Sequence, residues 1–275
     1  MRPALTAAQD ASGGMPAADV ADGAAMQAAV LDWYRRHGRD LPWRHTHDPY
    51  AILISEVMLQ QTQVSRIVPR YLEWLERWPA AEALAAASPA DVIRAWAGLG
   101  YNRRAVNLHR CAQEVVRRGG FPRDPAELRK LPGVGPYTAA AIACFAFGAQ
   151  IAAPDVNARR VLGRAFGDPD LPPAAGRAYD WNQALFDLGS TICIARRPRC
   201  TACPLAARCP SAGMTFAPER KQSPFHGSFR QRRSTVLKRL VAGPLHVSEL
   251  DGEALAALVA DGLAVIDGDV AALPT

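Results

Sequence analysis

The stretch Leu131-Pro-Gly-Val-Gly-Pro-Tyr-Thr138 decides the fold expected for this 275-residue chain. Just before it, Asp124-Pro-Ala-Glu127 has the pattern of a helix start, with a glutamate placed to complete a capping box. Gly133 and Gly135 allow the backbone to reverse, and Pro136 can begin another helix. The stretch therefore predicts a short helix that ends near residue 130, a glycine-rich turn and a second helix.

This turn is also a candidate anion site. The backbone N–H groups of Gly133, Gly135 and Tyr137 would have no partner inside a helix, and the positive end of the helix dipole would lie beside them. A phosphate oxygen suits such a turn, and a monovalent cation could bridge the phosphate group and the turn. However, Gly-x-Gly is a short motif, and an ordinary helical hairpin with packing glycines has the same pattern.

Composition predicts a mainly α-helical protein with a basic surface. Between residues 26 and 190, Pro and Gly divide the chain into segments of helix length with helical apolar spacing. The net charge is +6, but residues 196–239 contain eleven Lys and Arg against Glu219, a local excess of 10, so the remainder carries −4. Such a block suggests a polyanion partner, nucleic acid rather than a membrane, although a solvated linker remains an alternative.

The two ends of the chain have patterns of their own. Residues 1–24 are rich in Ala, Gly and Asp, lack the pattern of a signal peptide, and are expected to be a disordered leader of a cytoplasmic protein without a disulfide framework. Residues 230–275 predict a basic helix, a short element, a second helix and a hairpin with an Asp-Gly turn. This is the order of a small winged helix, which could bind DNA or pack against the rest of the protein.

Glu56 breaks the pattern of its helix. Asp48 and Pro49 predict the helix start, and Glu56 then shares an apolar face with Ile52 and Leu59. Burial disfavours the charged form of a carboxyl group and should raise its pKa, as a general acid near neutral pH requires. The alternative is a glutamate that pairs with a basic residue elsewhere.

Polar side chains follow this helix and interrupt a later one. The first group consists of Gln60, Gln61, Thr62 and Gln63, which cannot all lie in a core and suit hydrogen bonding to a nucleic-acid groove. The second contains Tyr101, which follows a glycine and precedes Asn102 and two arginines. Tyr101 is either a core residue beside solvated charges or an aromatic wedge beside phosphate-binding groups.

Two further segments have alternative interpretations. Arg39-Asp-Leu-Pro-Trp-Arg44 is expected to be extended, with Trp43 either anchoring the core or lying against a flat ring in a pocket. Asp155 and Asn157 precede a basic helix, so either could be its N-cap. A carboxylate at a helix start is favoured in its charged form, which leaves room for a second role.

Four cysteines have the spacing C-x6-C-x2-C-x5-C within 17 residues. They are Cys193, Cys200, Cys203 and Cys209. Four thiolates so close in sequence predict a tetradentate site, which either zinc or a [4Fe–4S] cluster would satisfy. Cys111 and Cys144 lie in helical runs and are expected to be small core residues.

Together, and in this order, the motifs resemble those of the helix-hairpin-helix (HhH-GPD) glycosylases of base excision repair, over about residues 28–212. Within them the chain resembles the MutY-type adenine glycosylases, in a short form similar to that of actinobacteria. The motifs are Leu-Pro-Trp-Arg, Ser-Glu-Val-Met-Leu-Gln-Gln-Thr-Gln-Val, Gly-Leu-Gly-Tyr, Leu-Pro-Gly-Val-Gly-x-Tyr-Thr, Asp-x-Asn, Trp-Asn-Gln-Ala and the four cysteines.

The resemblance implies a two-domain architecture and a cofactor. Residues 49–157 would form a six-helix barrel domain with the hairpin, and residues 25–48 and 158–215 a second domain with a [4Fe–4S] cluster. Residues 216–229 would be a basic linker to the winged-helix-like module. The expected partner is double-stranded DNA with a mismatch or an oxidised base, bound by a monomer without membrane contact.

The resemblance also implies roles for individual residues. Glu56 would protonate adenine at N7, and Asp155 would stabilise the oxocarbenium ion, as two carboxylates do in glycoside hydrolysis. Tyr137 and Asn157 would support them, and Tyr137 replaces the Schiff-base lysine of bifunctional relatives. The implied adenine pocket consists of Arg39, Leu41, Trp43 and Arg44. The implied DNA contacts are Gln60, Gln61, Thr62, Tyr101, Gly133, Gly135, Pro136 and Thr138.

The sequence departs from the family pattern at three places. Val156 replaces the glycine of Asp-Gly-Asn, Asn102 replaces a second tyrosine, and the short tail stands where a Nudix-like domain usually reads 8-oxoguanine. Two alternatives therefore remain: a uracil or thymine mismatch glycosylase, and a non-catalytic DNA-binding iron–sulfur protein.

Overall fold

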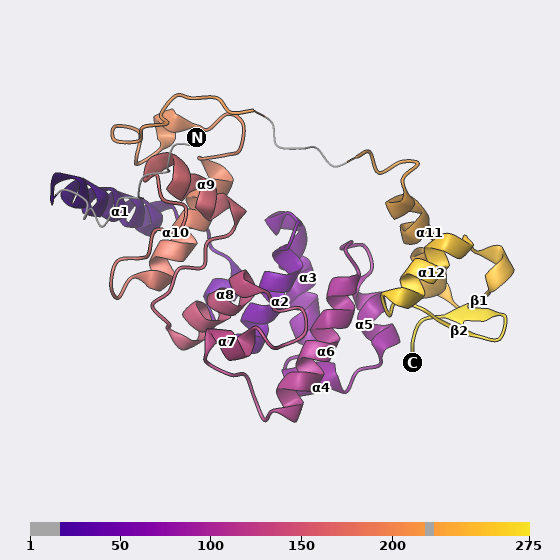
Figure 1. Cartoon of the computed structure of the whole chain (residues 1–275). Helices are drawn as coiled ribbons and strands as arrows, with labels where there is room; N and C mark the ends of the chain where they lie inside the picture. Colours follow the sequence, from indigo (N-terminus) through magenta and orange to yellow (C-terminus); the bar gives the residue numbers. More distant parts are fainter. Residues whose placement is uncertain (1–16, 218–222) are drawn as a thin grey trace, which may run out of the picture.

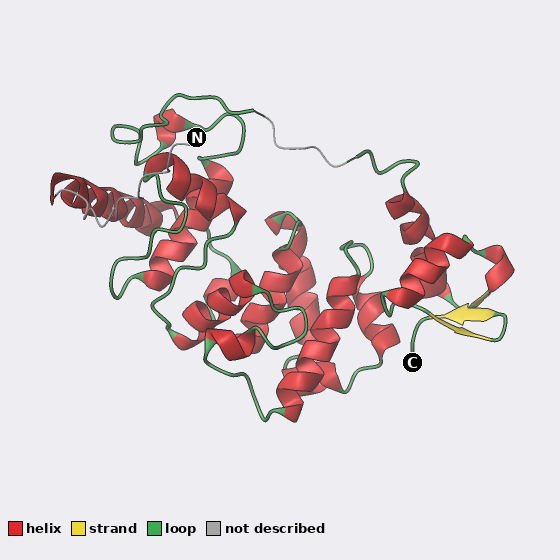
Figure 2. Ribbon diagram, viewed as in Figure 1, coloured by secondary structure: helices red, strands yellow, loops and turns green. Residues whose placement is uncertain are grey.

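Helices make up nearly all of the regular structure (Figures 1 and 2). The computed structural model describes residues 17–217 and 223–275. The α-helices are α1 Ala17–His37, α2 Pro49–Leu59, α3 Val64–Arg77, α4 Ala81–Ala85, α5 Pro89–Trp96, α6 Arg103–Arg117, α7 Pro125–Leu128, α8 Pro136–Phe147, α9 Val156–Ala165, α10 Ala178–Thr191, α11 Phe229–Ala242 and α12 Gly252–Ala260. The short 3₁₀ helices are η1 Pro42–Arg44, η2 Cys200–Ala202 and η3 Val247–Glu249. The predicted mainly α-helical class is confirmed.

The first helix begins earlier than predicted. The prediction placed a disordered leader up to residue 24, whereas α1 begins at Ala17. The sequence of this first part, AADVADGAA, is rich in alanine, the residue with the highest helix propensity, and this outweighs a single internal glycine. The prediction of disorder was therefore wrong for residues 17–24, and its remaining part, residues 1–16, lies outside the described residues.

The predicted helix starts are present, with one difference. Asp48 caps α2 by accepting hydrogen bonds from the backbone N–H groups of residues 50 and 51, and Asp124 caps α7 in the same way. The expected capping box at α7 does not form, because the Glu127 side chain instead accepts from Lys130 at 2.5 Å and lies 3.8 Å from Arg118. The contact with Arg118, the C-cap of α6, connects α7 to the end of α6.

Buried side chains form three clusters. The largest fills the space among helices α2 to α8, and a second joins α1, α9 and α10 to the cysteine-containing loop through Leu205. The third lies within the C-terminal module and includes Ala90 and Ile93 of α5. Leu41, Trp43 and Ile52, members of the first cluster, also line the cleft described below.

The C-terminal module, residues 229–273, packs against the outer side of α5 (Figure 1). Its strands β1 Leu245–His246, β2 Val265–Asp267 and β3 Val270–Ala272 form an antiparallel sheet in the order β1-β3-β2. The predicted hairpin with its Asp-Gly turn joins β2 to β3. The module thus packs against α5, and its binding to DNA stays a prediction.

The basic helix of this module carries less unpaired charge than its sequence indicates. Arg232 forms salt bridges with Asp251 and Glu253, and Arg233 pairs with Asp261. Acidic residues from outside the basic block of residues 196–239 therefore neutralise part of it. The predicted linker of residues 216–229 lies partly outside the described residues.

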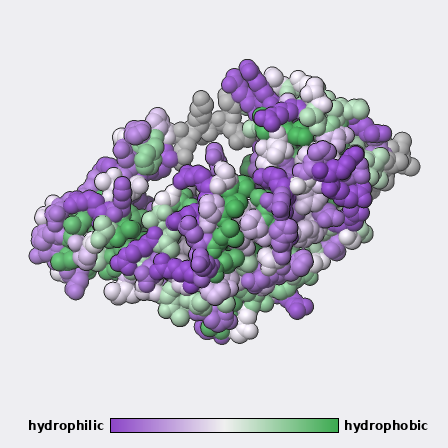
Figure 3. Space-filling view, turned by 180° about the vertical axis from the view of Figure 1, so that it is seen from behind, coloured by the Kyte–Doolittle hydropathy of each residue, from purple (hydrophilic) through white to green (hydrophobic). Residues whose placement is uncertain are grey.

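Hydrophilic side chains dominate the face of the molecule seen from behind, and hydrophobic ones are exposed there only in small patches (Figure 3). Among the described residues, no helix combines the length and the apolar character that a membrane span requires.

Candidate active site

An open cleft with about 2260 Å³ of empty space brings together residues from α2, α8 and the start of α9. All eight residues predicted for catalysis or the base pocket lie in its lining, together with three of the predicted DNA contacts, although they are far apart in sequence. These are Arg39, Leu41, Trp43, Arg44, Glu56, Gln60, Gln61, Thr62, Tyr137, Asp155 and Asn157. The cleft is thus the candidate active site.

Glu56 projects into this cleft from the buried face of α2. It is 6% exposed, and its neighbours along the helix are buried apolar residues. Burial raises its pKa from 4.5 to about 7, the charge of Asp155 adds to this shift, and a hydrogen bond with Tyr137 opposes it. The carboxyl group therefore holds a proton near neutral pH, as predicted from the helix pattern.

Tyr137 lies in the first turn of α8, directly after the glycine-rich turn. Its pKa is raised well above 10, because the hydroxyl is buried and faces the charges of Glu56 and Asp155. Its ring contacts that of Phe186 at a centroid distance of 6.2 Å. The neutral phenol therefore donates a hydrogen bond to the Glu56 carboxyl group and offers no amine nucleophile.

Asp155 is held in place by the start of α9. One carboxylate oxygen accepts from the backbone N–H of Ala158 at 2.7 Å, and the other accepts from the Asn157 amide at 2.9 Å. Arg160 in turn donates to Asn157 Oδ1 and to the carbonyl oxygen of Cys193, both at 2.8 Å. Asp155 is thus the N-cap of α9, and this role fixes the direction of its carboxylate toward the cleft.

The predicted base-pocket arginines contact a buried acid. Asp187 of α10 is 0% exposed and accepts hydrogen bonds from Arg39 and Arg44, at distances from 2.7 to 2.9 Å. These ion pairs hold Asp187 in its charged form and lower its pKa against the effect of its burial. They also fasten η1 to α10, and so position the buried side chains of Leu41 and Trp43 at the cleft.

The hairpin turn presents part of its predicted contact surface to solvent. Gly133, Gly135 and Pro136 are exposed, whereas Thr138 is buried and only 3% exposed. Gly133 has a φ of +76°, and a Cβ atom there would lie 2.8 Å from Asn107 Cβ. A glycine is required at this position, and the Thr138 side chain faces the protein interior.

Tyr101 lies apart from the lining of the cleft, in the loop between α5 and α6. Its side chain is 46% exposed, and its backbone has a φ of +46°. Gln61, at the end of α2, has a similar backbone, with a φ of +56°. The two residues predicted to enter DNA are thus the two non-glycine residues with positive φ among the described residues.

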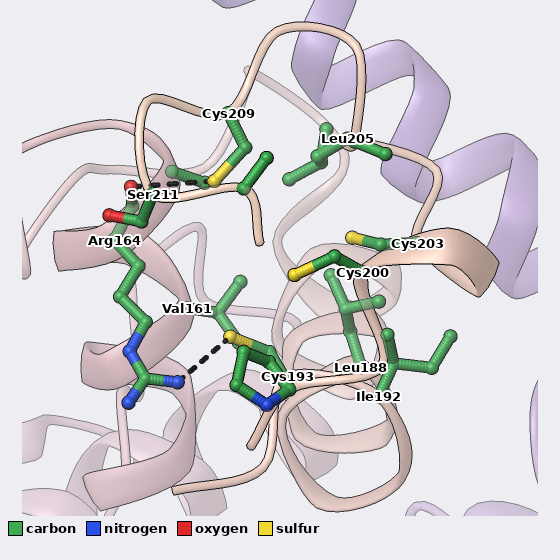
Figure 4. A pocket seen from close by; sticks show the side chains of 14 residues that line it. Val161, Arg164, Leu188, Ile192, Cys193, Cys200, Cys203, Leu205, Cys209 and Ser211 are labelled. Carbon is green, nitrogen blue, oxygen red and sulfur yellow. Dashed lines mark hydrogen bonds between the residues drawn. The ribbon is translucent and has the colours of Figure 1, made fainter. Parts of the chain in front are cut away.

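The four cysteines of the predicted cluster loop line a second, smaller pocket (Figure 4). Its other walls include the apolar side chains of Val161, Leu188 and Leu205. Arg164 donates to the Cys193 sulfur at 3.6 Å. Among residues 17–217 and 223–275, no three His, Cys, Asp or Glu side chains form a group suited to a single metal ion. Cys111 and Cys144 are buried core residues, as predicted.

Sequence reasoning missed three residues that support these sites. They are Asp187, Arg160 and Arg164. Asp187 could have been found by the argument used for Glu56, since it too is a carboxylate among apolar neighbours, in the segment Ala184-Leu-Phe-Asp-Leu188. The two arginines carry no such signal, because their acceptors lie about 30 residues away in the sequence.

The fold and the hairpin agree with known DNA repair proteins. Residues 54–178 match the model of the HhH-GPD superfamily base excision DNA repair proteins. A solved structure of a thermostable thymine-DNA glycosylase is 31% identical, with a TM-score of 0.65, and covers 70% of this chain and 97% of its own. Endonuclease III, trapped as a covalent intermediate with DNA, has a similar fold, with a TM-score of 0.60 at 21% identity, and covers 69% of this chain and 95% of its own. These similarities define the class as helix-hairpin-helix base excision repair.

Sequence similarity to a curated protein identifies the family within this class. The adenine DNA glycosylase of Mycolicibacterium smegmatis is 42% identical over 265 residues, which cover 85% of this chain and 90% of that protein. The chain therefore belongs to the adenine DNA glycosylase family of the HhH-GPD superfamily.

Proposed function

We propose that this DNA glycosylase removes adenine mispaired with 8-oxoguanine or guanine, by hydrolysis of the N-glycosidic bond. The observation that carries the proposal is the pair of carboxyl groups in one cleft. Glu56 has a pKa of about 7, and Asp155 is oriented by two N–H donors. Family membership supports adenine as the base, since the relative from M. smegmatis is an adenine DNA glycosylase.

In the proposed reaction Glu56 acts on the departing base and Asp155 acts on the sugar. The protonated Glu56 carboxyl group donates to N7 of a flipped adenine, which lets the base leave with the bonding electrons. The Asp155 carboxylate stabilises the positive charge that develops on the sugar. Glu56, now ionised, can accept a proton from the water that attacks the sugar, and Tyr137 keeps its carboxylate in place by hydrogen bonding.

The DNA contacts are proposed from exposure and backbone geometry. Double-stranded DNA would bind across the cleft, with phosphate oxygens at the N–H groups of Gly133 and Gly135 and a bridging monovalent cation at this turn. Gln61 and Tyr101 would enter the space left by the flipped base. Gln60 and Thr62 line the cleft beside them and would contact the groove. We propose that a monomer suffices, because all these residues come from one chain.

The active site would lie between two domains. Residues 49–157 supply Glu56 and the hairpin, and residues 25–48 with 158–215 supply the second wall. Asp155 lies at the boundary between them, at the start of α9. Both carboxyl groups would then face the same nucleotide.

The cysteine pocket is proposed to hold a [4Fe–4S] cluster. Four thiols around one space with apolar walls fit this cofactor. Cys193, Cys200, Cys203 and Cys209 would be its ligands. Bound there, the cluster would cross-link the loop that follows α10, and Arg164 would donate to a ligating sulfur. An absorbance spectrum of the purified protein distinguishes an iron–sulfur cluster from zinc.

Excision assays test the proposed function. Duplexes with A opposite 8-oxoguanine, A opposite G, U opposite G and T opposite G are incubated with the protein, and abasic sites are then cleaved with alkali. We expect cleavage of the two adenine duplexes only. Activity on U or T alone would favour the function of the thymine-DNA glycosylase with the similar fold. No product from any duplex would contradict the enzymatic function.

A further inference from the structure

Two loops of the barrel have unfavourable backbone conformations. Gln61 and Tyr101 have φ angles of +56° and +46°, a region that side chains with a Cβ rarely adopt. Such conformations persist only where surrounding contacts enforce them, and they often occur at functional sites. Contacts around Gln61 and Tyr101 must therefore stabilise these two backbone conformations.

The side chain of Arg104 contacts both loops. Its Nη1 donates to the carbonyl oxygens of Val57 and Gln60, each at 2.7 Å, just before Gln61. Its Nη2 donates to Gly100 at 3.1 Å, just before Tyr101. One planar guanidinium group thus connects the end of α2 to the loop between α5 and α6.

Ring contacts and charge add to this arrangement. The guanidinium carbon lies 5.6 Å from the centre of the Tyr101 ring and 5.1 Å from that of Trp96, within the range of cation–π attraction. Among the described residues, no carboxylate forms a salt bridge with Arg104, whose N–H groups point to backbone carbonyls instead. A lysine could not replace it, because a single ammonium group cannot reach both sets of carbonyls in this fixed geometry.

We propose that Arg104 is a positioning residue that holds Gln61 and Tyr101 ready to enter the DNA together before the base is flipped. The proposal rests on the proposed glycosylase function and adds how its two wedge residues are coupled. Insertion of a side chain into a duplex has to offset the loss of base stacking. Loops already fixed in the inserted conformation would lower this cost, since no ordering of the loops remains to be done.

The test compares two substrates and two variants. One substrate has adenine opposite guanine in a stable duplex, and the other has the same adenine opposite an abasic site, where little stacking has to be broken. Arg104→Lys removes the bridge and keeps the charge. Arg70→Lys is the matched control, because Arg70 also donates to backbone carbonyls, those of Ala95 and Ala97, but contacts neither Gln61 nor Tyr101.

We expect Arg104→Lys to lower the single-turnover rate on the stable duplex by about tenfold or more and on the abasic-site duplex by less than about threefold. The fluorescence of 2-aminopurine at the target position should show the same loss of flipping. Arg70→Lys should leave the ratio of the two rates unchanged. An equal loss on both substrates, or no loss on either, would overturn the proposal.

The ratio of the two rates keeps the test valid for a destabilised variant, because an unfolded fraction lowers both rates equally. Arg104→Gln, which is smaller and uncharged, provides a second variant with the same expected ratio. Failure of the proposed function would be recognised separately, since the unaltered protein would then remove no adenine from either substrate.

Discussion

Glu56 and Asp155 face one cleft from two walls that are built differently. Glu56 lies in the middle of α2, on a buried helix face where neighbouring side chains exclude water. Asp155 is the N-cap of α9, where Ala158 and Asn157 supply N–H donors to its two oxygens. The same functional group thus has a raised pKa in one wall and a fixed orientation in the other.

The different surroundings of the two carboxyl groups suit them to different roles. A buried carboxyl group without a strong cationic partner favours its neutral form, which is the form a general acid needs. A carboxylate that receives N–H donors at a helix start is positioned to meet a developing positive charge. Substitution of each carboxyl group, or of a residue that orients it, therefore tests which role that group has.

The largest effect is expected for Glu56→Gln. Glutamine has nearly the same shape but has no acidic proton to donate, so the rate of adenine excision should fall by about 10²–10⁴-fold. A single-turnover assay on A opposite 8-oxoguanine measures this loss. Glu73→Gln, at an exposed glutamate on α3, is the control and should keep the full rate. A Glu56→Gln rate within tenfold of that of the unaltered protein would remove the general acid from the mechanism.

Asp155→Asn should cost somewhat less, about 10²–10³-fold in the same assay, because it removes the charge that stabilises the sugar cation. Asparagine is also a good N-cap, so the free energy of unfolding should change by only about 0.5 kcal/mol. Asp48→Asn, at the N-cap of α2, is the matched control for the cap alone. If both substitutions slowed excision equally, the effect of Asp155 would be structural.

Stability should respond to Glu56 in the opposite sense to activity. Its folded pKa of about 7 lies above the ordinary 4.5, so its stabilising contribution is complete below pH 4.5 and is lost as the pH rises through 7. The free energy of unfolding of Glu56→Gln is compared with that of the unaltered protein at each pH. Between pH 4.5 and pH 9, this difference should shift in favour of the variant by on the order of 3 kcal/mol. Urea unfolding at both pH values measures this, and parallel curves would contradict a buried, proton-binding Glu56.

The pH dependence of the rate gives a smaller effect. Once Glu56 loses its proton, excision should fall about tenfold per pH unit above pH 7. This decline should persist in Asp155→Asn and disappear from the residual rate of Glu56→Gln. A decline that survives in Glu56→Gln would have to come from another group.

Much of the site could be predicted from local sequence patterns. Burial of Glu56 follows from helical periodicity, the Asp155 cap from its place before α9, and the hairpin from two glycines and a proline. Each depends on residues within about one helical turn, where sequence fixes neighbours in space. The four cysteines were likewise predicted to lie together because they are close in sequence.

Contacts between distant segments could not be predicted in this way. Arg104 was expected only as one of two charges beside Tyr101, yet its acceptors include carbonyls 44 and 47 residues away. The basic block suggested an exposed anion-binding surface, whereas Arg232 and Arg233 pair with acids about 20 to 30 residues further on. The number of basic residues in a segment does not show which acidic residues the fold places beside that segment.

The smallest effect is expected for Asn157→Ala. The change removes the amide that donates to Asp155 at 2.9 Å and accepts from Arg160 at 2.8 Å, but leaves the backbone cap from Ala158 intact. The carboxylate should then be less well oriented, and excision should slow about tenfold. Because Asn157 acts only through Asp155, the double variant with Asp155→Asn should be no slower than Asp155→Asn alone. Additive losses would show instead that Asn157 contacts the DNA directly, and Asp155 would then depend for its orientation on the start of α9 alone.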